Sequence, residues 1–306
     1  MKTVYYKPGV SLTDIPITCA LGFFDGVHLG HRHLIEECIK EAKKTKTASA
    51  VFTFSSEEKN LKGGVPRLYT TEEKLSLLES LGLDLVIVAD FSEVCTLSPE
   101  SFVKDVLIRD LGVITALSGE GFRFGTRASG DARILSRLME SSGRHAVTVK
   151  DVAIDGKNVS STAIREALAE GRVKYANTLL SSPYFKRNVV QRGLGLGHLH
   201  GFPTVNTDLS SENPLKSGVY ITELSVDEKS YISLTNVGVC PTFGERERHA
   251  ETMIMDFSGD LYGKTVNIKF LDYLRDEVRY SSAEELGNQI KIDMEAIRKW
   301  QATGRS

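Results

Sequence analysis

The sequence predicts two successive folds: a doubly wound α/β domain with a parallel sheet, then a small antiparallel β-barrel that ends in a helix. Short apolar runs alternate with segments of helical spacing up to about residue 154, as they do where crossover helices join parallel strands. Near Tyr184 the pattern changes to short β-rich segments separated by Gly, Pro, Asn and Asp, which is typical of a small barrel. We therefore expect one domain over residues 1–183 and a second over residues 184–306.

The composition is that of a globular protein with no large basic surface. A chain of 306 residues is long enough for two cores, and its formal net charge of −2 argues against a nucleic-acid partner. No apolar run reaches the length of a membrane span, and Met1–Tyr6 lacks a signal-peptide core, so we expect a cytoplasmic protein without a membrane partner. The cysteines lack metal-site spacing and are expected to be reduced thiols. They are Cys19, Cys38, Cys95 and Cys240.

Five short apolar runs predict the strands of the parallel sheet. The run at residues 84–89 is continuously apolar after Asp84, as a strand buried on both faces should be. The runs span residues 16–21, 48–54, 84–89, 113–117 and 146–149. Helices are expected between them, beginning near His31, at Thr71, after Ser98 and at Asp131. Ligands of such sheets bind at the carboxyl ends of the strands.

The second half of the chain predicts helices at both ends of a set of short strands. Two short helices are expected between residues 160 and 182, and a final helix runs from Ser282 to Trp300. The expected strands span residues 188–191, 218–224, 231–237, 252–257 and 265–271.

The turn after the first apolar run, residues 22–31, reads Gly-Phe-Phe-Asp-Gly-Val-His-Leu-Gly-His. Its glycines allow the backbone to approach a ligand closely. They stand at Gly22, Gly26 and Gly30. His28 and His31 come at the start of the next helix, where the backbone amides attract anions. The turn predicts a phosphate site with two imidazoles directed into it; the alternative is that the two histidines cap the helix or lie in a solvated loop.

The string Gly-x-Phe-Asp-Gly-x-His-x-Gly-His resembles the amino-terminal module of prokaryotic riboflavin kinase/FAD synthetases, and His-x-Gly-His is similar to the nucleotidyltransferase signature. The resemblance implies an α/β nucleotidyltransferase domain. It also implies that His28 and His31 bind the triphosphate of ATP and stabilise the charge on the departing pyrophosphate. Further ATP-binding residues implied by the resemblance are Gly22, Phe24, Asp25 and Gly30.

The string Ser-Ser-Thr-Ala-Ile-Arg at residues 160–165 is a second candidate phosphate site. Hydroxyl groups at a helix start can bind a phosphate, and an arginine one turn later can grip it with two hydrogen bonds. The alternative is an ordinary helix cap followed by a surface arginine. The string resembles the Ser-Ser-Thr-x-Ile-Arg element of the same family, which implies that Ser161, Thr162 and Arg165 hold the β- and γ-phosphates.

Two aromatic segments are candidates for an FMN site. Residues 119–125 look like the family's Gly-x-Asp/Asn-Phe-x-Phe-Gly loop, which implies that Phe122 and Phe124 contact FMN. Aromatic residues in loops also serve as hydrophobic plugs, so that alternative stays open. Phe54 closes the run 48–54, and by resemblance it borders the flavin, although the family's usual Pro-His-Pro is absent after it.

In the second domain, residues 201–206 resemble the Gly-Phe-Pro-Thr-Ala-Asn motif of riboflavin kinases. Thr204 and Asn206 alternate onto one face of an extended segment, so both side chains can reach a Mg²⁺–nucleotide. A glycine flap precedes the motif and is suited to wrapping phosphates with backbone amides. It contains Gly193, Gly195 and Gly197, and no helix follows it, so it is not a dinucleotide fingerprint.

Later motifs of the kinase follow in order. A glutamate at the position of Glu251 is, by resemblance, the general base that takes the proton of the ribityl hydroxyl during phosphoryl transfer. Taken alone, Glu251 would be a solvated strand residue. Arg275 and Glu277 would otherwise form an exposed ion pair of little value. The resemblance places both near the nucleotide or the flavin.

The resemblance covers nearly the whole chain and implies a bifunctional, Mg²⁺-dependent enzyme. One module would phosphorylate riboflavin with ATP to give FMN, and the other would join FMN and ATP to give FAD and pyrophosphate. An alternative is a single-activity FAD synthetase whose barrel only binds flavin, because His198, Cys240 and Met253 replace residues usual in the family's kinase module. Two further alternatives are another His-x-Gly-His adenylyltransferase and a non-enzymatic flavin-sensing regulator.

Overall fold

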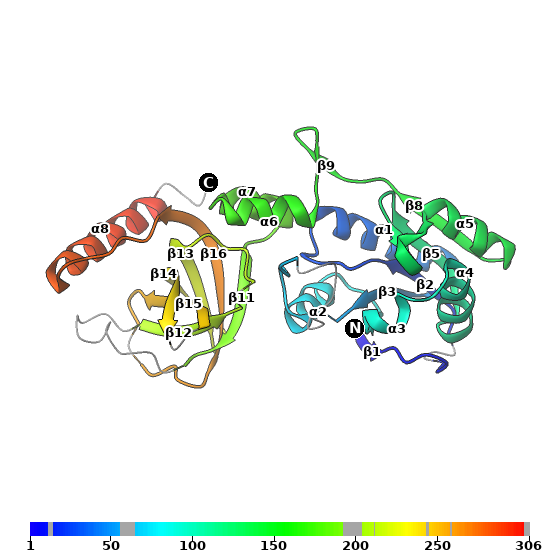
Figure 1. Cartoon of the computed structure of the whole chain (residues 1–306), viewed down its shortest axis with the longest axis horizontal. Helices are drawn as coiled ribbons and strands as arrows, with labels where there is room; N and C mark the ends of the chain where they lie inside the picture. Colours follow the sequence, from blue (N-terminus) through cyan, green and yellow to red (C-terminus); the bar gives the residue numbers. More distant parts are fainter. Residues whose placement is uncertain are drawn as a thin grey trace. The chain divides into compact units, whose positions relative to one another are not determined.

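The computed structural model divides into two compact units, Met1–Ser161 and Thr162–Ser306 (Figure 1). The residues that it describes are 1–11, 15–55, 65–191, 204–210, 212–242, 245–257 and 259–302. The predictions for Gly193, Gly195, Gly197 and His198 lie outside the described residues, and so does the side chain of Cys240.

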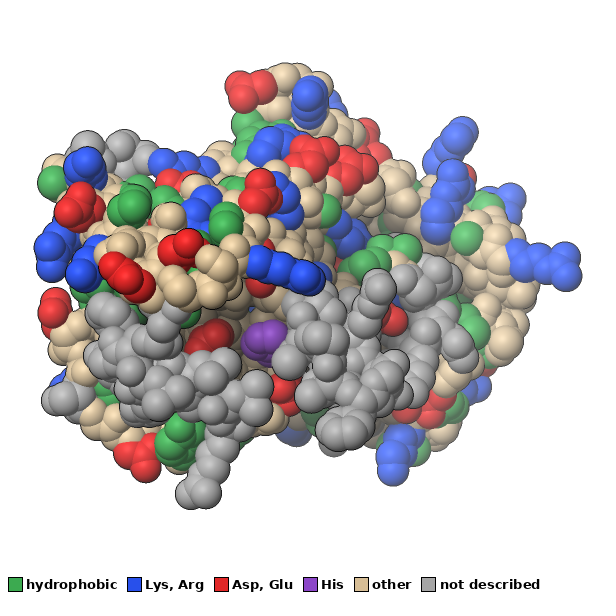
Figure 2. Space-filling view, turned by 60° about the vertical axis from the view of Figure 1, so that its left-hand side comes forward, with side chains coloured by type: hydrophobic (Ala, Val, Ile, Leu, Met, Phe, Trp, Pro, Cys, Tyr) green, Lys and Arg blue, Asp and Glu red, His purple; other side chains and the backbone are tan. Residues whose placement is uncertain are grey.

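Charged side chains of both signs cover the surface. On the face drawn in Figure 2, Lys and Arg lie among Asp and Glu and do not gather into one basic area. This mixture accords with the formal net charge of −2. In the described part of the chain, no helix is both long enough and apolar enough to cross a membrane.

The first unit is built on a six-stranded, wholly parallel sheet in the order β1-β4-β3-β2-β5-β8. Its strands are β1 (Lys2–Tyr5), β2 (Ile17–Leu21), β3 (Ala48–Phe54), β4 (Leu85–Ala89), β5 (Val113–Gly119) and β8 (His145–Val149). Strands β2 to β4 proceed toward one edge, whereas β5 and β8 lie on the other side of β2. The order therefore reverses between β2 and β5, and a ligand of such a sheet binds beyond the carboxyl ends of these two strands.

Helices connect these strands, and two short hairpins follow β5 and β8. The helices are α1 (Leu29–Thr45), α2 (Thr71–Glu79), α3 (Phe91–Val94), α4 (Pro99–Ser101), the π-helical η2 (Phe102–Asp110), the 3₁₀ turn η3 (Thr126–Ala128) and α5 (Ala132–Ser141). The hairpins pair β6 (Arg123–Phe124) with β7 (Gly130–Asp131), and β9 (Ala153–Ile154) with β10 (Lys157–Asn158). Neighbouring residues of β3 enter different cores, Val51 on one face and Phe52 on the other. The predicted doubly wound sheet, buried on both faces, is confirmed.

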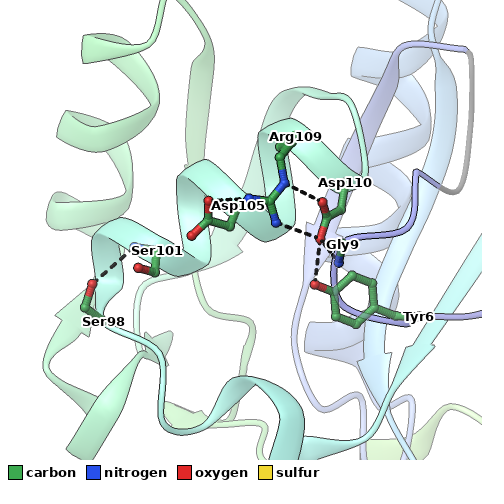
Figure 3. Close-up of polar contacts among 7 residues, drawn as sticks. All are labelled: Tyr6, Gly9, Ser98, Ser101, Asp105, Arg109 and Asp110. Carbon is green, nitrogen blue, oxygen red and sulfur yellow. Dashed lines mark hydrogen bonds and ion pairs between the residues drawn. The ribbon is translucent and has the colours of Figure 1, made fainter.

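Strand β1 was not predicted, and a polar network holds it at the sheet edge (Figure 3). The Tyr6 hydroxyl and the Gly9 amide both donate to Asp110 Oδ2, at 3.0 and 2.9 Å, and Arg109 Nε donates to Asp110 Oδ1 at 2.8 Å. Burial alone would raise the pKa of Asp110, which is 2% exposed, but the bonds from Arg109, Gly9 and Tyr6 hold it below its usual range. The carboxylate at the end of η2 thus anchors the segment after β1.

The second unit begins with two helices, α6 (Ser161–Ala169) and α7 (Val173–Leu180), and continues as an antiparallel sheet. The strand order is β11-β16-β13-β14-β15-β12. The strands are β11 (Tyr184–Val189), β12 (Thr204–Leu209), β13 (Gly218–Val226), β14 (Lys229–Thr242), β15 (Glu245–Ile254) and β16 (Thr265–Arg275). Gln191, just after β11, bridges to Asn206 of β12, and its amide donates to the Asn206 carbonyl at 2.8 Å. The sheet therefore curls until its two edge strands approach each other, which confirms the predicted barrel.

The compact units divide at residues 161 and 162, not at the expected boundary after residue 183. The reason is that α6 and α7 pack with the second unit. Asn177 Nδ2 donates to the Phe270 carbonyl at 2.9 Å, and the Lys216 amide donates to the Leu168 carbonyl at 3.0 Å. The boundary between the two activities, residues 1–183 and 184–306, stays a prediction.

The two faces of the second sheet differ in chemistry. The inner face carries a chain of four buried hydroxyl side chains linked by hydrogen bonds of 2.7–2.9 Å. They are Ser233, Thr222, Thr235 and Thr252. The opposite face packs against the final helix, α8 (Ala283–Ala302), through an apolar cluster that includes Leu234, Met253 and Ile297. Met253, one of the departures from the family pattern, thus serves as a core residue.

Candidate active sites

The turn between β2 and α1 has a strained backbone. Phe24, Gly26 and Val27 have φ angles of 52°, 93° and 43°, in the left-handed region that is costly for residues other than glycine. A β-branched residue such as Val27 is rare there. Both Phe24 and Val27 are fully buried in the core between α1 and the sheet. Burial of these side chains holds the strained turn, as is common at functional sites.

The strained turn places His28 at the N-cap of α1. Its Nδ1 accepts a hydrogen bond from the His31 amide at 3.3 Å, so the hydrogen of a neutral His28 ring is on Nε2. The two imidazoles stack with 3.6 Å between ring centroids, and the His31 ring also packs edge-on against Phe24. A Cβ at Gly30 would lie 3.3 Å from His28 Nδ1, so a side chain there would displace the ring. The helix start therefore presents paired imidazoles and backbone amides, a suitable arrangement for a phosphate.

The other predicted ATP-binding residues of the first unit support this turn. Asp25 Oδ1 accepts a hydrogen bond from the Leu68 amide at 3.1 Å, and the Asp25 carbonyl accepts one from Ser161 Oγ at 2.6 Å. Phe24 lies beneath the turn, and a Cβ at Gly22 would lie 3.2 Å from its ring. The direct contact of these residues with ATP stays a prediction.

Thr162 and Arg165 lie in the first two turns of α6. They fall within the second compact unit, whereas Ser161 ends the first. Thr162 is exposed and Arg165 is half-buried. Their predicted role in binding the β- and γ-phosphates therefore stays a prediction.

Aromatic side chains gather beyond the carboxyl ends of β3 and β5, on the two sides of β2. The Phe54 ring packs at a tilt against Phe23, with 4.6 Å between ring centroids, and edge-on against Phe91, with 5.3 Å between centroids. Phe122 stacks on Phe124 at 5.5 Å. Phe54 and Phe124 are buried, as hydrophobic plugs would be, whereas Phe23 and Phe122 are half-exposed. We call these five rings, Phe23, Phe54, Phe91, Phe122 and Phe124, the aromatic wall. Its half-exposed pair is the part that a planar ligand can reach.

Lys74 supports the same aromatic wall and was not predicted as a site residue. It is 3% exposed, and its ammonium donates to the Phe54 carbonyl at 2.5 Å, to Thr53 Oγ1 at 3.2 Å and to the Phe23 carbonyl at 3.4 Å. Thr53 Oγ1 itself donates to the Phe23 carbonyl at 2.8 Å. Lys74 thus ties the end of β3 to the turn after β2. A lysine in the first turn of a helix opposes the helix dipole. This unfavourable placement is the sequence feature that could have indicated a role for Lys74.

The second unit brings three predicted kinase residues together. Glu251 of β15 lies directly opposite Asn206 of β12, and Thr204 is two residues from Asn206 on the same face. Thr204 Oγ1 donates to Glu251 Oε1 at 2.9 Å. A carboxylate, a hydroxyl and an amide therefore share one patch of the sheet. All three side chains are half-buried.

Asn236 extends this row, although it was not predicted as a site residue. On β14 it lies directly opposite Glu251, on the side away from Asn206. Its Nδ2 donates to Glu277 Oε1 at 3.1 Å. Glu277 also approaches Gly238 so closely that a Cβ there would clash with the carboxylate. Asn236 thus contacts Glu277 and neighbours Glu251 on the adjacent strand.

Arg275 does not form the exposed ion pair with Glu277 that its position alone would give. It instead pairs with Asp293 of α8, through Nη2 to Oδ2 at 2.7 Å and Nε to Oδ1 at 3.0 Å. The Arg275 side chain is 23% exposed and that of Asp293 is 3% exposed. The hydrogen bonds to Asp293 raise the pKa of Arg275. Arg275 therefore fastens α8 to β16, and its predicted contact with nucleotide or flavin stays a prediction.

These features define a protein with two separate candidate sites: a histidine turn at the switch point of a parallel sheet, and a carboxylate–amide row on a β-barrel. Comparison with known families agrees with this division. Residues 12–163 match the FAD synthetase family, and residues 180–301 match the riboflavin kinase family.

Whole-chain relatives carry both domains. A bifunctional riboflavin kinase/FMN adenylyltransferase from Listeria monocytogenes is 32% identical over 310 residues, covering 97% of this chain and 98% of the relative. One from Bacillus subtilis is 33% identical over 290 residues, covering 91% of each chain. The chain belongs to the bifunctional riboflavin kinase/FMN adenylyltransferase family, and it is an enzyme of flavin cofactor biosynthesis.

A solved structure extends the likeness to the fold. The crystal structure named for a macrolide-efflux protein from Streptococcus pneumoniae matches this one with a TM-score of 0.87. It is 28% identical and covers 97% of this chain and 99% of its own.

Proposed function

We propose that the second unit phosphorylates riboflavin with ATP, and that the first unit joins the resulting FMN to a second ATP to form FAD and pyrophosphate. The observation that supports this most directly is that each family-matched domain contains one assembled polar site: the His28/His31 stack in the first and the Glu251 row in the second. A synthetase whose barrel only binds flavin would not need a carboxylate positioned beside that row as a general base.

In the adenylyltransferase reaction, a phosphate oxygen of FMN attacks the α-phosphorus of ATP, and the bond to the departing pyrophosphate breaks. This exchange needs no covalent enzyme intermediate and no proton acceptor. It needs positioning and neutralisation of the charge on pyrophosphate. His28 Nε2, the His31 ring and the amides at the start of α1 supply donors for that charge. Ser161, Thr162 and Arg165 would bind the β- and γ-phosphates.

The FMN for this reaction would lie along the aromatic wall. Phe54 ends β3, and Phe122 and Phe124 follow β5; the two strands flank the strand that leads into the histidine turn. Buried Phe54 and Phe124 would back the half-exposed Phe122, which faces the ligand. A flat ring system packs well against aromatic side chains. Lys74 would keep the backbone under this wall in place.

In the kinase reaction, Glu251 would take the proton of the terminal ribityl hydroxyl as that oxygen attacks the γ-phosphorus of ATP and ADP departs. The hydrogen bond from Thr204 fixes one oxygen of Glu251 and leaves the other for the substrate. Thr204 and Asn206 also fit a magnesium site, because both present neutral oxygen ligands on one face beside a carboxylate. When bound, Mg²⁺ would neutralise charge on the β- and γ-phosphates.

Both reactions use ATP, and FMN is the product of one and a substrate of the other. We place the protein in the cytoplasm, where ATP is available and where free thiols such as buried Cys19 and Cys38 stay reduced.

A pair of crossed variants tests the assignment of the two sites. With riboflavin and Mg²⁺–ATP, Glu251→Gln should form at least about 100-fold less FMN. His31→Gln should accumulate FMN and form at least about 100-fold less FAD. Mixing the two variants should restore FAD formation from riboflavin, because FMN made by one reaches the intact site of the other.

Matched controls separate chemistry from folding. His33→Gln, on the same helix as His31, and Glu228→Gln, in the exposed turn between β13 and β14, should leave both reactions within about twofold of wild type. Wild-type FMN formation by Glu251→Gln, or wild-type FAD formation by His31→Gln, would overturn the corresponding site.

A further inference from the structure

One side-chain atom of Asn236 has no hydrogen-bond partner in the described part of the chain. Its Oδ1 is buried and accepts no hydrogen bond from any described residue. Buried polar atoms nearly always have a partner, so an exception calls for an explanation such as a ligand atom. The atom lies on β14 directly opposite Glu251, the base of the proposed kinase reaction.

The orientation of the Asn236 amide follows from chemistry. Its nitrogen faces Glu277 Oε1 at 3.1 Å, and an ionised carboxylate only accepts hydrogen bonds. Turning the amide over would place two acceptor oxygens against each other. The nitrogen therefore stays on Glu277, and Oδ1 stays directed elsewhere as a free acceptor.

An acceptor here needs a ligand that donates a hydrogen. The phosphates of Mg²⁺–ATP present oxygens without hydrogens, so they do not satisfy Oδ1. Magnesium held by Asn206 is too distant. Asn206 and Asn236 are separated by β15, which puts two strand spacings, about 9.6 Å, between their backbones. Side chains on one face stand roughly perpendicular to the sheet, so the two side-chain oxygens stay farther apart than the roughly 4 Å between two ligands of one Mg²⁺ ion.

A hydroxyl of the flavin substrate meets these requirements. We propose that Asn236 Oδ1 accepts a hydrogen bond from a non-reacting hydroxyl of the ribityl chain and so selects flavins with an intact polyol. This inference rests on the proposed kinase site. Side chains directly opposite on neighbouring strands have Cβ atoms about 5 Å apart. A polyol whose terminal hydroxyl is at Glu251 therefore has its next hydroxyls within reach of Asn236.

The proposal is tested with Asn236→Ala and three riboflavin analogues that lack the 2′-, the 3′- or the 4′-hydroxyl and keep the reacting 5′-hydroxyl. With riboflavin, Asn236→Ala should lower kcat/KM for FMN formation by about 2- to 13-fold, the range of one lost hydrogen bond. For one analogue, the kcat/KM of the wild type should fall by a similar factor relative to riboflavin, and the kcat/KM of the variant should be the same for that analogue as for riboflavin. For the other two analogues, the kcat/KM of the variant should lie below that of the wild type by the same factor as with riboflavin.

Two outcomes would overturn the proposal. One is a kcat/KM for riboflavin within twofold of wild type. The other is an equal deficit on riboflavin and on all three analogues, which would assign Asn236 to holding Glu277. Asn236→Leu, of similar branched shape, serves as a second variant if the alanine protein does not fold, and FAD formation from added FMN reports the first unit. Failure of the wild type to phosphorylate riboflavin would instead refute the proposed function itself.

Discussion

The ion pair between Arg275 and Asp293 predicts how strongly α8 is bound to the second unit. Asp293→Asn removes the charge of a carboxylate that is 3% exposed and that accepts hydrogen bonds from Nε and Nη2 of Arg275. Removing one partner of a buried pair costs about 3–5 kcal/mol. We expect the lower end, about 3 kcal/mol, because Arg275 is 23% exposed and Nη1 keeps its bond to the Asp276 carbonyl.

This loss translates into a measurable shift in melting temperature. For a unit the size of Thr162–Ser306, about 1 kcal/mol corresponds to about 3–4 °C, so the variant should melt about 10 °C lower. The assay is calorimetry of the full chain, with the transition of the second unit identified by loss of riboflavin phosphorylation after heating. The transition of the first unit should not move.

The matched control is Asp227→Asn, which removes an ion pair with Lys264 in the same unit. There the two side chains are 67% and 45% exposed, so the pair is worth less than about 1 kcal/mol. A shift of about 3 °C or less is expected. If the two variants melt at the same temperature, burial does not strengthen the Arg275–Asp293 pair, and the reasoning is wrong.

Three further predictions concern the first unit. The pKa of folded Asp110 is lowered, so its contribution to stability is complete above the unfolded pKa of about 4 and is lost as pH falls through the folded value. Urea unfolding should therefore show a steeper loss of stability below about pH 4 for wild type than for Asp110→Asn, and parallel curves would contradict this. Lys74→Met should raise the KM for FMN at least about threefold, through displacement of the aromatic wall, and leave riboflavin phosphorylation unchanged. Lys40→Met, on an exposed face of α1, is its control, and equal KM values for the two variants would refute the role. Gly30→Ala should lower kcat for FAD formation at least about tenfold, because the added methyl group displaces a stacked imidazole. Gly287→Ala, which meets nothing within 4 Å, should have no effect on that rate, and normal FAD formation by the Gly30 variant would contradict the geometry.

The buried strands of the parallel sheet could be predicted because both of their faces are apolar. Residues 48–54 form β3 with the same limits as expected, and the five predicted strands are all present. Strand β1 was missed because it is short and lies at an edge, where Lys2 and Tyr5 stay exposed and break the apolar pattern. The division of the compact units after residue 161 could not be predicted, because α6 and α7 are assigned to the second unit by tertiary contacts and not by a local sequence pattern.

The candidate sites could be predicted where a local string specifies them. The histidine turn is such a string, because its strand, glycines and helix start are contiguous. The role of Asn236 depends on the register of three strands, and Asp293 reaches Arg275 from a helix that begins eight residues later. No local sequence pattern therefore predicts either role. Lys74 depends on a contact across more than 50 residues of sequence to Phe23.

The most direct test of the account is the identity of the flavins that the purified protein makes. The protein is incubated with Mg²⁺–ATP and riboflavin, and separately with Mg²⁺–ATP and FMN, and the products are separated by chromatography. The account predicts FMN and then FAD from riboflavin, and FAD with pyrophosphate from FMN. FAD from FMN but no FMN from riboflavin would contradict the kinase assignment of the Glu251 row. No FAD from either substrate would contradict the role of the histidine turn.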